Sequence, residues 1–338
     1  MAPNALRRSL ARAVPRSVRR RLKRSRPVQR FVRGRCLPRL LAFPSRIEIE
    51  TTSFCNGRCR HCEYSTLGRP PAHMSMDLYR KIVDECAIHS DHCREVYLFW
   101  MGEPFLDPTF FEKVRYAKEK DSFLVASYSN GSMLTPENCD RVIESGLDSL
   151  VFGTDGATKE SYESIRVNLS YGRMVEGITR LAELKKRKGV DKPHIKVQMV
   201  LTPHNEHEVE LFEQTWAGIA DEVTLRKMAV WSSDAMDESL EDYSRQLIGE
   251  EIPASVPCVF LWVLMVVAQD GRVAFCCTDA RVQEVVGDLN SETLEDVWRG
   301  DRMARLRELH VAGRLEDVPL CATCNHRQIV PYPWWWYD

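Results

Sequence analysis

Two features are missing from this 338-residue sequence, and each excludes a class of protein. No apolar run reaches the roughly eighteen uninterrupted residues that a membrane-spanning helix needs, so the sequence predicts no membrane span. Acidic residues are absent before Glu48, although the whole chain carries a formal net charge of only −1. The remainder is therefore acidic, and its composition, with 44% hydrophobic residues, is typical of a globular protein with one large domain and a smaller appendage.

The acid-free segment, residues 1–44, is strongly basic, with arginines and lysines crowded between Arg7 and Arg26. Such a segment is compatible with a transit peptide, a phosphate-binding arm or a twin-arginine export signal. Export requires an apolar stretch after the arginines, and Arg12 and Arg16 interrupt it here. We expect a solvated or loosely docked extension, and no nucleic-acid partner.

The twelve cysteines are grouped in a way that indicates metal ligation. Cys55, Cys59 and Cys62 form a CX3CX2C motif, and Cys321 and Cys324 form a CX2C pair. Many cysteines in a secreted chain would indicate disulfides, whereas this grouping is typical of metal sites in a reducing compartment, so we expect a cytoplasmic protein. Three thiolates can hold three irons of a 4Fe-4S cluster and leave the fourth open for chemistry. A zinc site with His61 as the fourth ligand is the alternative.

Strand-like and helix-like segments alternate from Arg46 onward, which predicts an α/β fold with a parallel sheet and right-handed crossovers over residues 45–250. Strands are expected at 46–51, 95–100, 123–128, 148–153, 194–201 and 222–230. Helices are expected at 77–88, 108–120 with Asp107 as N-cap, 136–145, a stretch ending near 188, and 208–219. Active groups of such folds lie at the carboxyl ends of the strands. The motifs that follow the first four strands are Cys55–Cys62, Met101–Pro104, Ser129–Gly131 and Thr154–Gly156.

A second cysteine region begins after residue 250. Asp270-Gly271 lies between two apolar runs, which predicts a hairpin that returns the chain to Cys276. A helix is expected further on, at 294–309. The four thiols of this region, enough to saturate one iron–sulfur cluster, are Cys258, Cys276, Cys321 and Cys324. Structural zinc is again the competing interpretation.

The first motif, with aromatic His61 before its last cysteine, resembles the signature of radical S-adenosylmethionine (SAM) enzymes. The resemblance implies a partial (β/α)6 TIM-like barrel, a 4Fe-4S cluster on Cys55, Cys59 and Cys62, and SAM bound at the open iron. Residues that it assigns to cofactor binding are His61, Gly102, Glu103, Pro104, Ser129, Asn130, Asp155 and Arg166. Two positions depart from the family pattern, since Met101 replaces a glycine and Gly153 a serine.

Residues 251–338 resemble the shortened SPASM or Twitch domain of that family. The likeness rests on Cys258-x12-Gly271-x4-Cys276, on Gly287-Asp288-Leu289 before the Trp298 helix, and on the closing Cys321-x2-Cys324-Asn325. It implies one auxiliary 4Fe-4S cluster, hence two clusters in all, because the further cysteines of the full domain are absent.

Single-auxiliary-cluster members are similar to the aminocyclitol and aminoglycoside dehydrogenases of antibiotic biosynthesis. The resemblance thus implies oxidation of a secondary alcohol to a ketone, with the electron passed to the auxiliary cluster and a flavodoxin- or ferredoxin-type reductant. Arg226 is a candidate for orienting the substrate. Two alternatives stay open: a sugar epimerase with Cys277 as hydrogen donor, and a peptide- or protein-modifying SPASM maturase.

Overall fold

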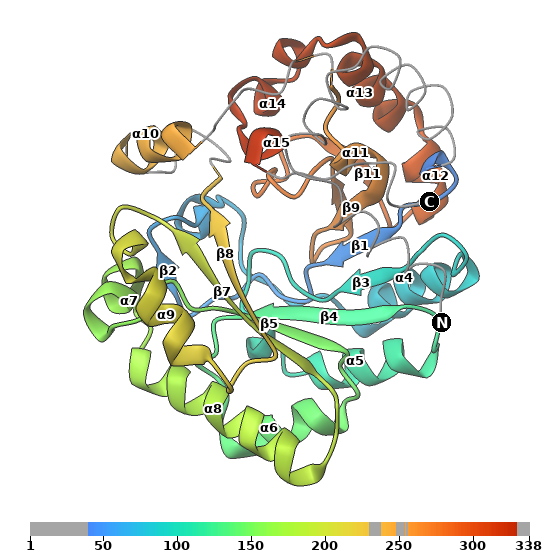
Figure 1. The fold of residues 1–338 in the computed structure, drawn as a ribbon. Coiled ribbons are helices and arrows are strands. Elements are labelled where there is room, and N and C mark those ends of the chain that lie inside the picture. The colour runs from blue at the N-terminus through green and yellow to red at the C-terminus, as the bar shows by residue number, and fades with distance from the viewer. Residues whose placement is uncertain (1–39, 230–237, 248–253, 255, 330–338) are drawn as a thin grey trace, which may run out of the picture.

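The structure is a computed structural model that describes residues 40–229, 238–247, 254 and 256–329. Its centre is a run of parallel strands, each separated from the next by at least one helix along the chain (Figure 1). In sheet order these strands are β1 (Arg46–Ile49), β3 (Glu95–Tyr97), β4 (Leu124–Ser129), β5 (Ser149–Gly153), β7 (His194–Leu201) and β8 (Glu222–Lys227). The six strands confirm the α/β class and the partial barrel.

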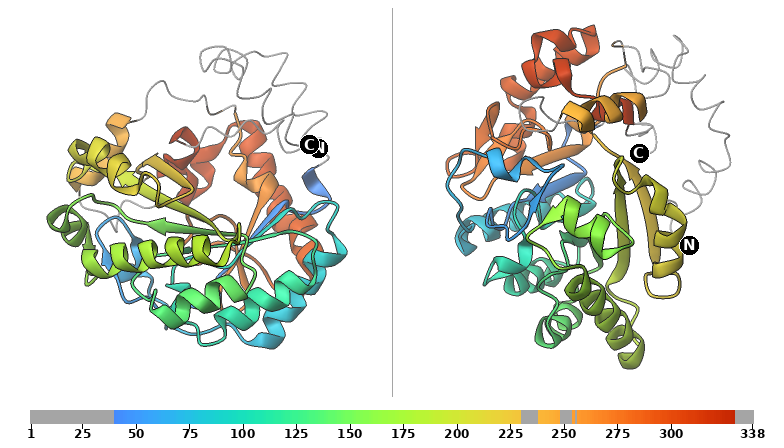
Figure 2. Two further views of the ribbon diagram at one scale, coloured as in Figure 1. Left: turned by 60° about the horizontal axis from the view of Figure 1, so that its bottom comes forward. Right: turned by 90° about the vertical axis from the view of Figure 1, so that its left-hand side faces the viewer.

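Helices cover the convex face of this curved sheet (Figures 1 and 2). They are α4 (Met76–Ile88), α5 (Phe110–Glu119), α6 (Pro136–Glu144), α8 (Tyr171–Lys188) and α9 (Val209–Trp216), while the short α7 (Lys159–Ile165) precedes α8. Ser75, Thr135 and Ser170 cap α4, α6 and α8 by accepting an amide hydrogen of the first turn. Among the described residues, no helix combines the length and the apolar character that crossing a membrane requires.

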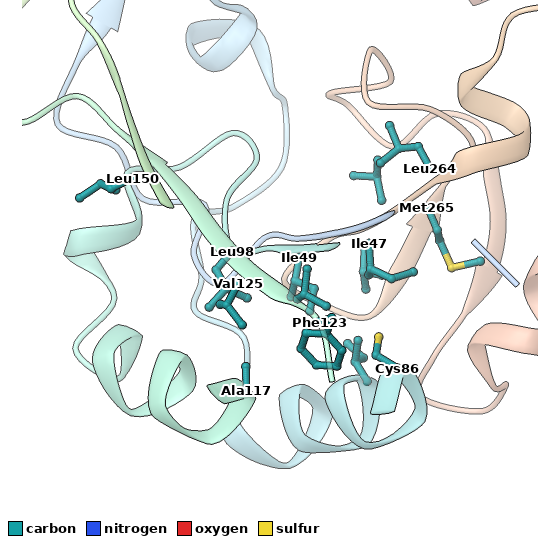
Figure 3. Close-up of a cluster of buried hydrophobic side chains, with 14 of the residues drawn as sticks. Ile47, Ile49, Cys86, Leu98, Ala117, Phe123, Val125, Leu150, Leu264 and Met265 are labelled. Atoms are coloured by element: carbon teal, nitrogen blue, oxygen red, sulfur yellow. The ribbon is translucent and has the colours of Figure 1, made fainter. Parts of the chain in front are cut away.

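The core lies between the strands and these helices. Figure 3 shows Ile47 and Ile49 of β1 and Val125 of β4 packed near Cys86 of α4 and Ala117 of α5. Side chains alternate between the two faces of a strand, so the residues between these apolar positions project to the concave face. That face carries the polar groups considered below.

The C-terminal region extends the same sheet, which the sequence did not predict. Strand β9 (Leu264–Val267) pairs in parallel with β1, and β10 (Arg272–Ala274) and β11 (Val285–Asp288) follow antiparallel, giving nine strands in all. The hairpin at Gly271 is confirmed, with φ +94° at that glycine. Other elements are β2 (Arg58–Cys59), β6 (Arg166–Val167), α10 (Glu238–Leu247), α11 (Phe260–Val263), α12 (Leu294–Arg299), α13 (Asp301–Ala312), α14 (Pro319–Thr323) and α15 (His326–Ile329).

Two local predictions were wrong. The helix expected at 294–309 is broken at Gly300, whose extended backbone (ψ 160°) ends α12 and begins α13. Asp107 is not the N-cap of α5, because Thr109 holds that position. The Asp107 carboxylate instead accepts hydrogen bonds from Thr109 and forms a buried salt bridge with Lys113, at 2.6 Å. Most of the basic segment 1–44 lies outside the described residues.

Candidate active site at the strand ends

The loop after β1 brings the three thiols of the first motif together. Burial raises the pKa of Cys55 to about 11 and that of Cys62 to about 12, and the neighbouring Cys59 adds to both shifts. Burial likewise raises the pKa of Cys59. Clustered thiols that resist ionisation by themselves fit a site in which iron supplies the compensating positive charge.

A strand pairing with a distant segment and a local hydrogen bond hold this loop in place. Strand β2 pairs antiparallel with β6, which sets Cys59 opposite Arg166. The Cys55 amide donates to the Tyr64 hydroxyl at 2.9 Å. A side chain at Gly57 would lie 3.1 Å from Leu169 and 3.6 Å from the Cys59 sulfur, so glycine leaves room beside the thiol.

The motif after β3 forms a buried hydrogen-bond network with the end of β4. The two Glu103 oxygens accept from the Ser129 hydroxyl at 2.8 Å and from the Asn130 amide at 2.7 Å. Glu103 also donates its own amide to the carbonyl of Phe54 in the cysteine loop. A Cβ at Gly102 would stand 2.1 Å from the Thr52 carbonyl oxygen, so only glycine allows the two loops to approach this closely.

Asn130 connects this network to the first cysteine motif. Its side-chain amide donates to Asn56 Oδ1 at 2.9 Å, between Cys55 and Gly57 in the chain. Pro104 begins a short 3-10 helix, Pro104–Leu106, and is buried. Met101 fills a small apolar cluster with Leu67 and Ala280, which explains how a large side chain replaces the glycine of the family pattern.

Asp155, Arg166 and His61 form a second network beside the thiols. Arg166 Nη2 lies 2.6 Å from Asp155 Oδ2 and its Nη1 lies 3.8 Å from the Cys59 sulfur, while His61 Nε2 is 3.3 Å from the same Asp155 oxygen. Burial acts to raise the pKa of Asp155, but the charge of Arg166 and the hydrogen bond from the Val200 amide outweigh it, and the pKa falls below its usual range. Burial lowers the pKa of His61, so its ring is neutral.

His61 also presents an unused polar atom. Its Nε2 faces an ionised carboxylate and carries the ring proton, which leaves Nδ1 as an acceptor. That Nδ1 is buried and has no hydrogen-bond partner among the described residues. An orphaned acceptor beside the thiols fits a cofactor that brings hydrogen-bond donors, as the predicted SAM would.

The replacement of serine by Gly153 now has a physical explanation. A Cβ at this position would lie 2.2 Å from Arg166 Nη2 and 3.0 Å from its Cζ. The guanidinium therefore occupies the space that a side chain would need. Glycine at 153 lets Arg166 reach both Asp155 and the cysteine loop.

The structure also brings the four C-terminal thiols together. Cys258 precedes α11, Cys276 follows β10, and Cys321 and Cys324 lie in α14 and at its end. Burial raises the pKa of Cys321, and the other three thiols of the set add to the shift. Among the described residues, no three His, Cys, Asp or Glu side chains are placed to bind one metal ion together. An iron–sulfur cluster has a different requirement, because each of its irons takes one thiolate.

His310 is a residue of this site that the sequence analysis missed. Its Nδ1 accepts the Cys258 amide hydrogen at 3.3 Å, so the ring proton lies on Nε2, which is 3.3 Å from the Cys321 sulfur. Burial lowers the pKa of His310 to about 4 and Arg327 contributes, which keeps the ring neutral. A lone histidine eleven residues before Cys321 carries no spacing signal, and only the packing of α13 shows its role.

Arg226 and Cys277 lie nearer the concave side. Arg226 is exposed on β8, and its charge reaches Glu48 of β1 and His326 of α15. Cys277 is half-buried, and its carbonyl accepts the Trp100 indole hydrogen at 3.0 Å. Their predicted roles toward substrate stay predictions.

A partial parallel barrel with three thiols on its first loop, and four more gathered in the C-terminal region whose strand β9 pairs with β1, defines an iron–sulfur protein with a cofactor site at the strand ends. The sequence comparison agrees: residues 49–214 match the Radical SAM superfamily and residues 258–325 match SPASM, the iron–sulfur cluster-binding domain. The chain belongs to the radical SAM superfamily and carries a SPASM domain. Its cofactors are S-adenosyl-L-methionine and 4Fe-4S clusters, which sets the zinc alternatives aside. The boundaries 45–250 and 251–338 enclose both matches and stay predictions.

The relatives have different activities. The S-adenosyl-L-methionine-dependent 2-deoxy-scyllo-inosamine dehydrogenase of Niallia circulans is 21% identical over 83% of this chain and 93% of its own length. Mycofactocin maturase MftC of Mycobacterium tuberculosis is 28% identical over 55% of this chain. The chain spans less than half the length of several relatives, including 43% of MftC. The crystal structure of BtrN in complex with AdoMet and 2-DOIA superposes on this chain with a TM-score of 0.54 at 20% identity. The superposition covers 85% of this chain and 97% of that one, and it supports the fold.

Proposed function

We propose that this protein is a radical SAM dehydrogenase that oxidises a secondary alcohol of an aminocyclitol or aminoglycoside to a ketone. The observation that carries the proposal is the auxiliary site. Its four thiols come together in the C-terminal region, and strand β9 of that region is hydrogen-bonded to β1 of the barrel. A cluster with a cysteine on every iron has no open position for substrate and is suited to electron transfer. An electron acceptor beside the barrel suits a two-electron oxidation.

The residues described above have separate tasks in this proposal. Cys55, Cys59 and Cys62 hold the cluster to which SAM binds, and the bound cofactor supplies the radical that removes hydrogen from the carbinol carbon. Residues on the surrounding loops receive the cofactor: His61, Gly102, Glu103, Pro104, Ser129, Asn130, Asp155 and Arg166. Cys258, Cys276, Cys321 and Cys324 hold the auxiliary cluster. Arg226 on the concave face orients substrate hydroxyls, and a cytoplasmic flavodoxin or ferredoxin is the proposed reductant.

The dehydrogenase relative supports this substrate class, since its match spans 83% of this chain and 93% of its own length. The test uses anaerobically reconstituted protein with dithionite, SAM and a panel of aminocyclitol glycosides. We expect about eight irons per chain, four for each cluster, with deoxyadenosine and ketone formed in equal amounts. Deoxyadenosine without ketone on every member of the panel would contradict the proposal.

A sugar epimerase is the second candidate, because the half-buried thiol of Cys277 lies within electrostatic reach of Glu48 on the concave face. An epimerase would return a product isomeric with the substrate and carrying one hydrogen from solvent. A Cys277→Ala variant should then lose that product, whereas a dehydrogenase should retain ketone formation. Modification of a precursor peptide, the activity class of the maturase relative, is tested by adding peptide in place of the sugar panel.

A further inference from the structure

The concave face of β1 carries a carboxylate that none of the roles above uses. Ile47 and Ile49 project into the core with the helices (Figure 3), so Glu48 between them projects to the opposite face. Arg226 lies on β8, at the far end of the six parallel strands, yet its charge acts on Glu48. Two residues at opposite ends of a curved sheet interact in this way when both point into its concave side.

Glu50, directly after β1, is by contrast a carboxylate with a structural role. Its two oxygens each lie 2.6 Å from the Arg69 guanidinium, and one also accepts the Gln269 amide hydrogen at 3.1 Å. Glu48 is only 7% exposed and has no hydrogen bond or salt bridge to any residue that the structure describes. Burying a carboxylate without a partner is unfavourable, so such groups are characteristic of functional sites.

The surroundings of Glu48 leave it free to exchange a proton. The charged or titratable groups that face it are Arg46 on β1, Glu95 and Tyr97 on β3, Arg226 on β8 and Cys277 after β10. Arg46 is bound to Glu95, at 2.5 and 2.8 Å, and so does not form a salt bridge with Glu48. Burial raises the pKa of Glu48 to about 7, with Glu95 adding to the rise and the two arginines opposing it. A carboxylate with this pKa accepts and releases protons readily near neutral pH.

The strand that carries Glu48 also adjoins both cysteine sites. Strand β1 leads directly into the Cys55–Cys62 loop, and its neighbour β9 continues through β10 to Cys276. We propose that Glu48 is the catalytic base of the reaction and accepts the hydroxyl proton of the substrate as the ketone forms. This inference rests on the proposed dehydrogenase function and assigns a residue to its proton-transfer step.

The proposed oxidation removes one hydrogen atom, one proton and one electron from the alcohol. A hydrogen atom leaves the carbinol carbon and becomes part of 5'-deoxyadenosine, which leaves a carbon-centred radical bearing a hydroxyl group. The O–H bond then breaks and its proton passes to the Glu48 carboxylate, while the C=O double bond forms. The remaining electron reduces the oxidised auxiliary iron–sulfur cluster. The alcohol has then lost two hydrogens and two electrons, and Glu48 returns its proton to solvent.

The first test separates hydrogen abstraction from ketone formation in the cluster-loaded enzyme, using substrate deuterated at the reacting carbon. We expect Glu48→Gln to transfer deuterium into deoxyadenosine as the wild type does, while ketone formation falls by about 100-fold or more. Glu95→Gln is the matched control, since it removes an acid from the same face that is already bound to Arg46, and it should reduce ketone formation far less. Unchanged ketone formation by Glu48→Gln overturns the proposal.

The second test needs no substrate. Because the pKa of Glu48 in the folded protein lies above that in the unfolded chain, the stability due to the protonated form is lost as the pH rises through about 7. Glu48→Gln cannot ionise, so its melting temperature should exceed that of the wild type by an amount that grows as the pH rises from about 4.5, the ordinary pKa of a glutamate, to about 7 and stays constant above that. The infrared carbonyl band of a buried, protonated carboxyl group should titrate in the same range and be reduced in the variant.

The outcomes distinguish this inference from the proposed function. If the wild type forms no ketone on any substrate, the dehydrogenase fails and the role of Glu48 fails with it. If the wild type and Glu48→Gln form ketone equally well, only the assignment of Glu48 as the base is wrong. The same holds if neither the melting temperature nor the infrared band depends on Glu48 near pH 7. Retained deuterium transfer with lost ketone and the pH-dependent gain in melting temperature supports both.

Discussion

At the scale of single residues, hydrogen bonds to sulfur distinguish the auxiliary thiols from one another. The Thr278 hydroxyl lies 3.5 Å from the Cys276 sulfur, and the His326 amide donates to the Cys324 sulfur at 3.4 Å. His310, which is buried in α13, places its Nε2 3.3 Å from the Cys321 sulfur. Such bonds orient a ligand and stabilise the negative charge that a cluster gains on reduction.

We therefore predict that His310→Ala lowers the reduction potential of the auxiliary cluster, because one donor to a ligating sulfur is lost. The measurement is a redox titration followed by electron paramagnetic resonance. His207→Ala, which changes an exposed histidine far along the chain from the thiols, is the control and should leave the potential unchanged. A variant with full iron content and an unaltered potential would show that His310 only fills space.

At the scale of elements, one buried ion pair connects the cofactor-binding motif to two helices. Lys113 of α5 lies 2.6 Å from Asp107, just after the Pro104–Leu106 turn, and 2.8 Å from the Met74 carbonyl before α4. Both charged side chains are fully buried. The pair thus fixes the position of the turn that follows Glu103.

Removing one partner leaves the other charge buried and uncompensated. We predict that Lys113→Ala lowers the free energy of unfolding by about 3–5 kcal/mol, measured by urea denaturation. It should also weaken SAM binding, because the Glu103 loop loses its support. Lys120→Ala, which breaks an exposed pair with Asp84 in the same region, should leave stability nearly unchanged. Equal effects of the two substitutions would contradict this account.

At the scale of the whole molecule, strand β1 joins the two cysteine sites. It is hydrogen-bonded on one side to β3 of the barrel and on the other to β9 of the C-terminal hairpin. The two sites therefore belong to one continuous sheet. A substrate on the concave side can accordingly be close to both.

This arrangement predicts that the two sites can be inactivated separately. Cys258→Ala should retain about four irons and still produce deoxyadenosine, but form no ketone, because the electron acceptor is lost. Cys59→Ala should also retain about four irons but produce no deoxyadenosine. Iron analysis and chromatography of both products provide the measurement. Ketone formation by Cys258→Ala would place the electron acceptor elsewhere.

The sequence by itself determined the class of fold and the two sets of cysteines. Alternating apolar segments of strand and helix length are local patterns, and they were enough to predict six parallel strands with their crossovers. The spacing of Cys55, Cys59 and Cys62 is likewise local. The glycine–acid–proline motif after the second strand could be found in the same way, although the reason for Gly102 could not.

Only the tertiary structure decided which distant groups meet. The pairing of β9 with β1, the contact of His310 with Cys321 and the isolation of Glu48 each join segments that no spacing relates. Gly153 looked like a departure from the family pattern until the Arg166 guanidinium was found in the space of its missing side chain. Strand pairing, burial and the presence or absence of a partner depend on packing between remote parts of the chain, so local sequence patterns do not contain them.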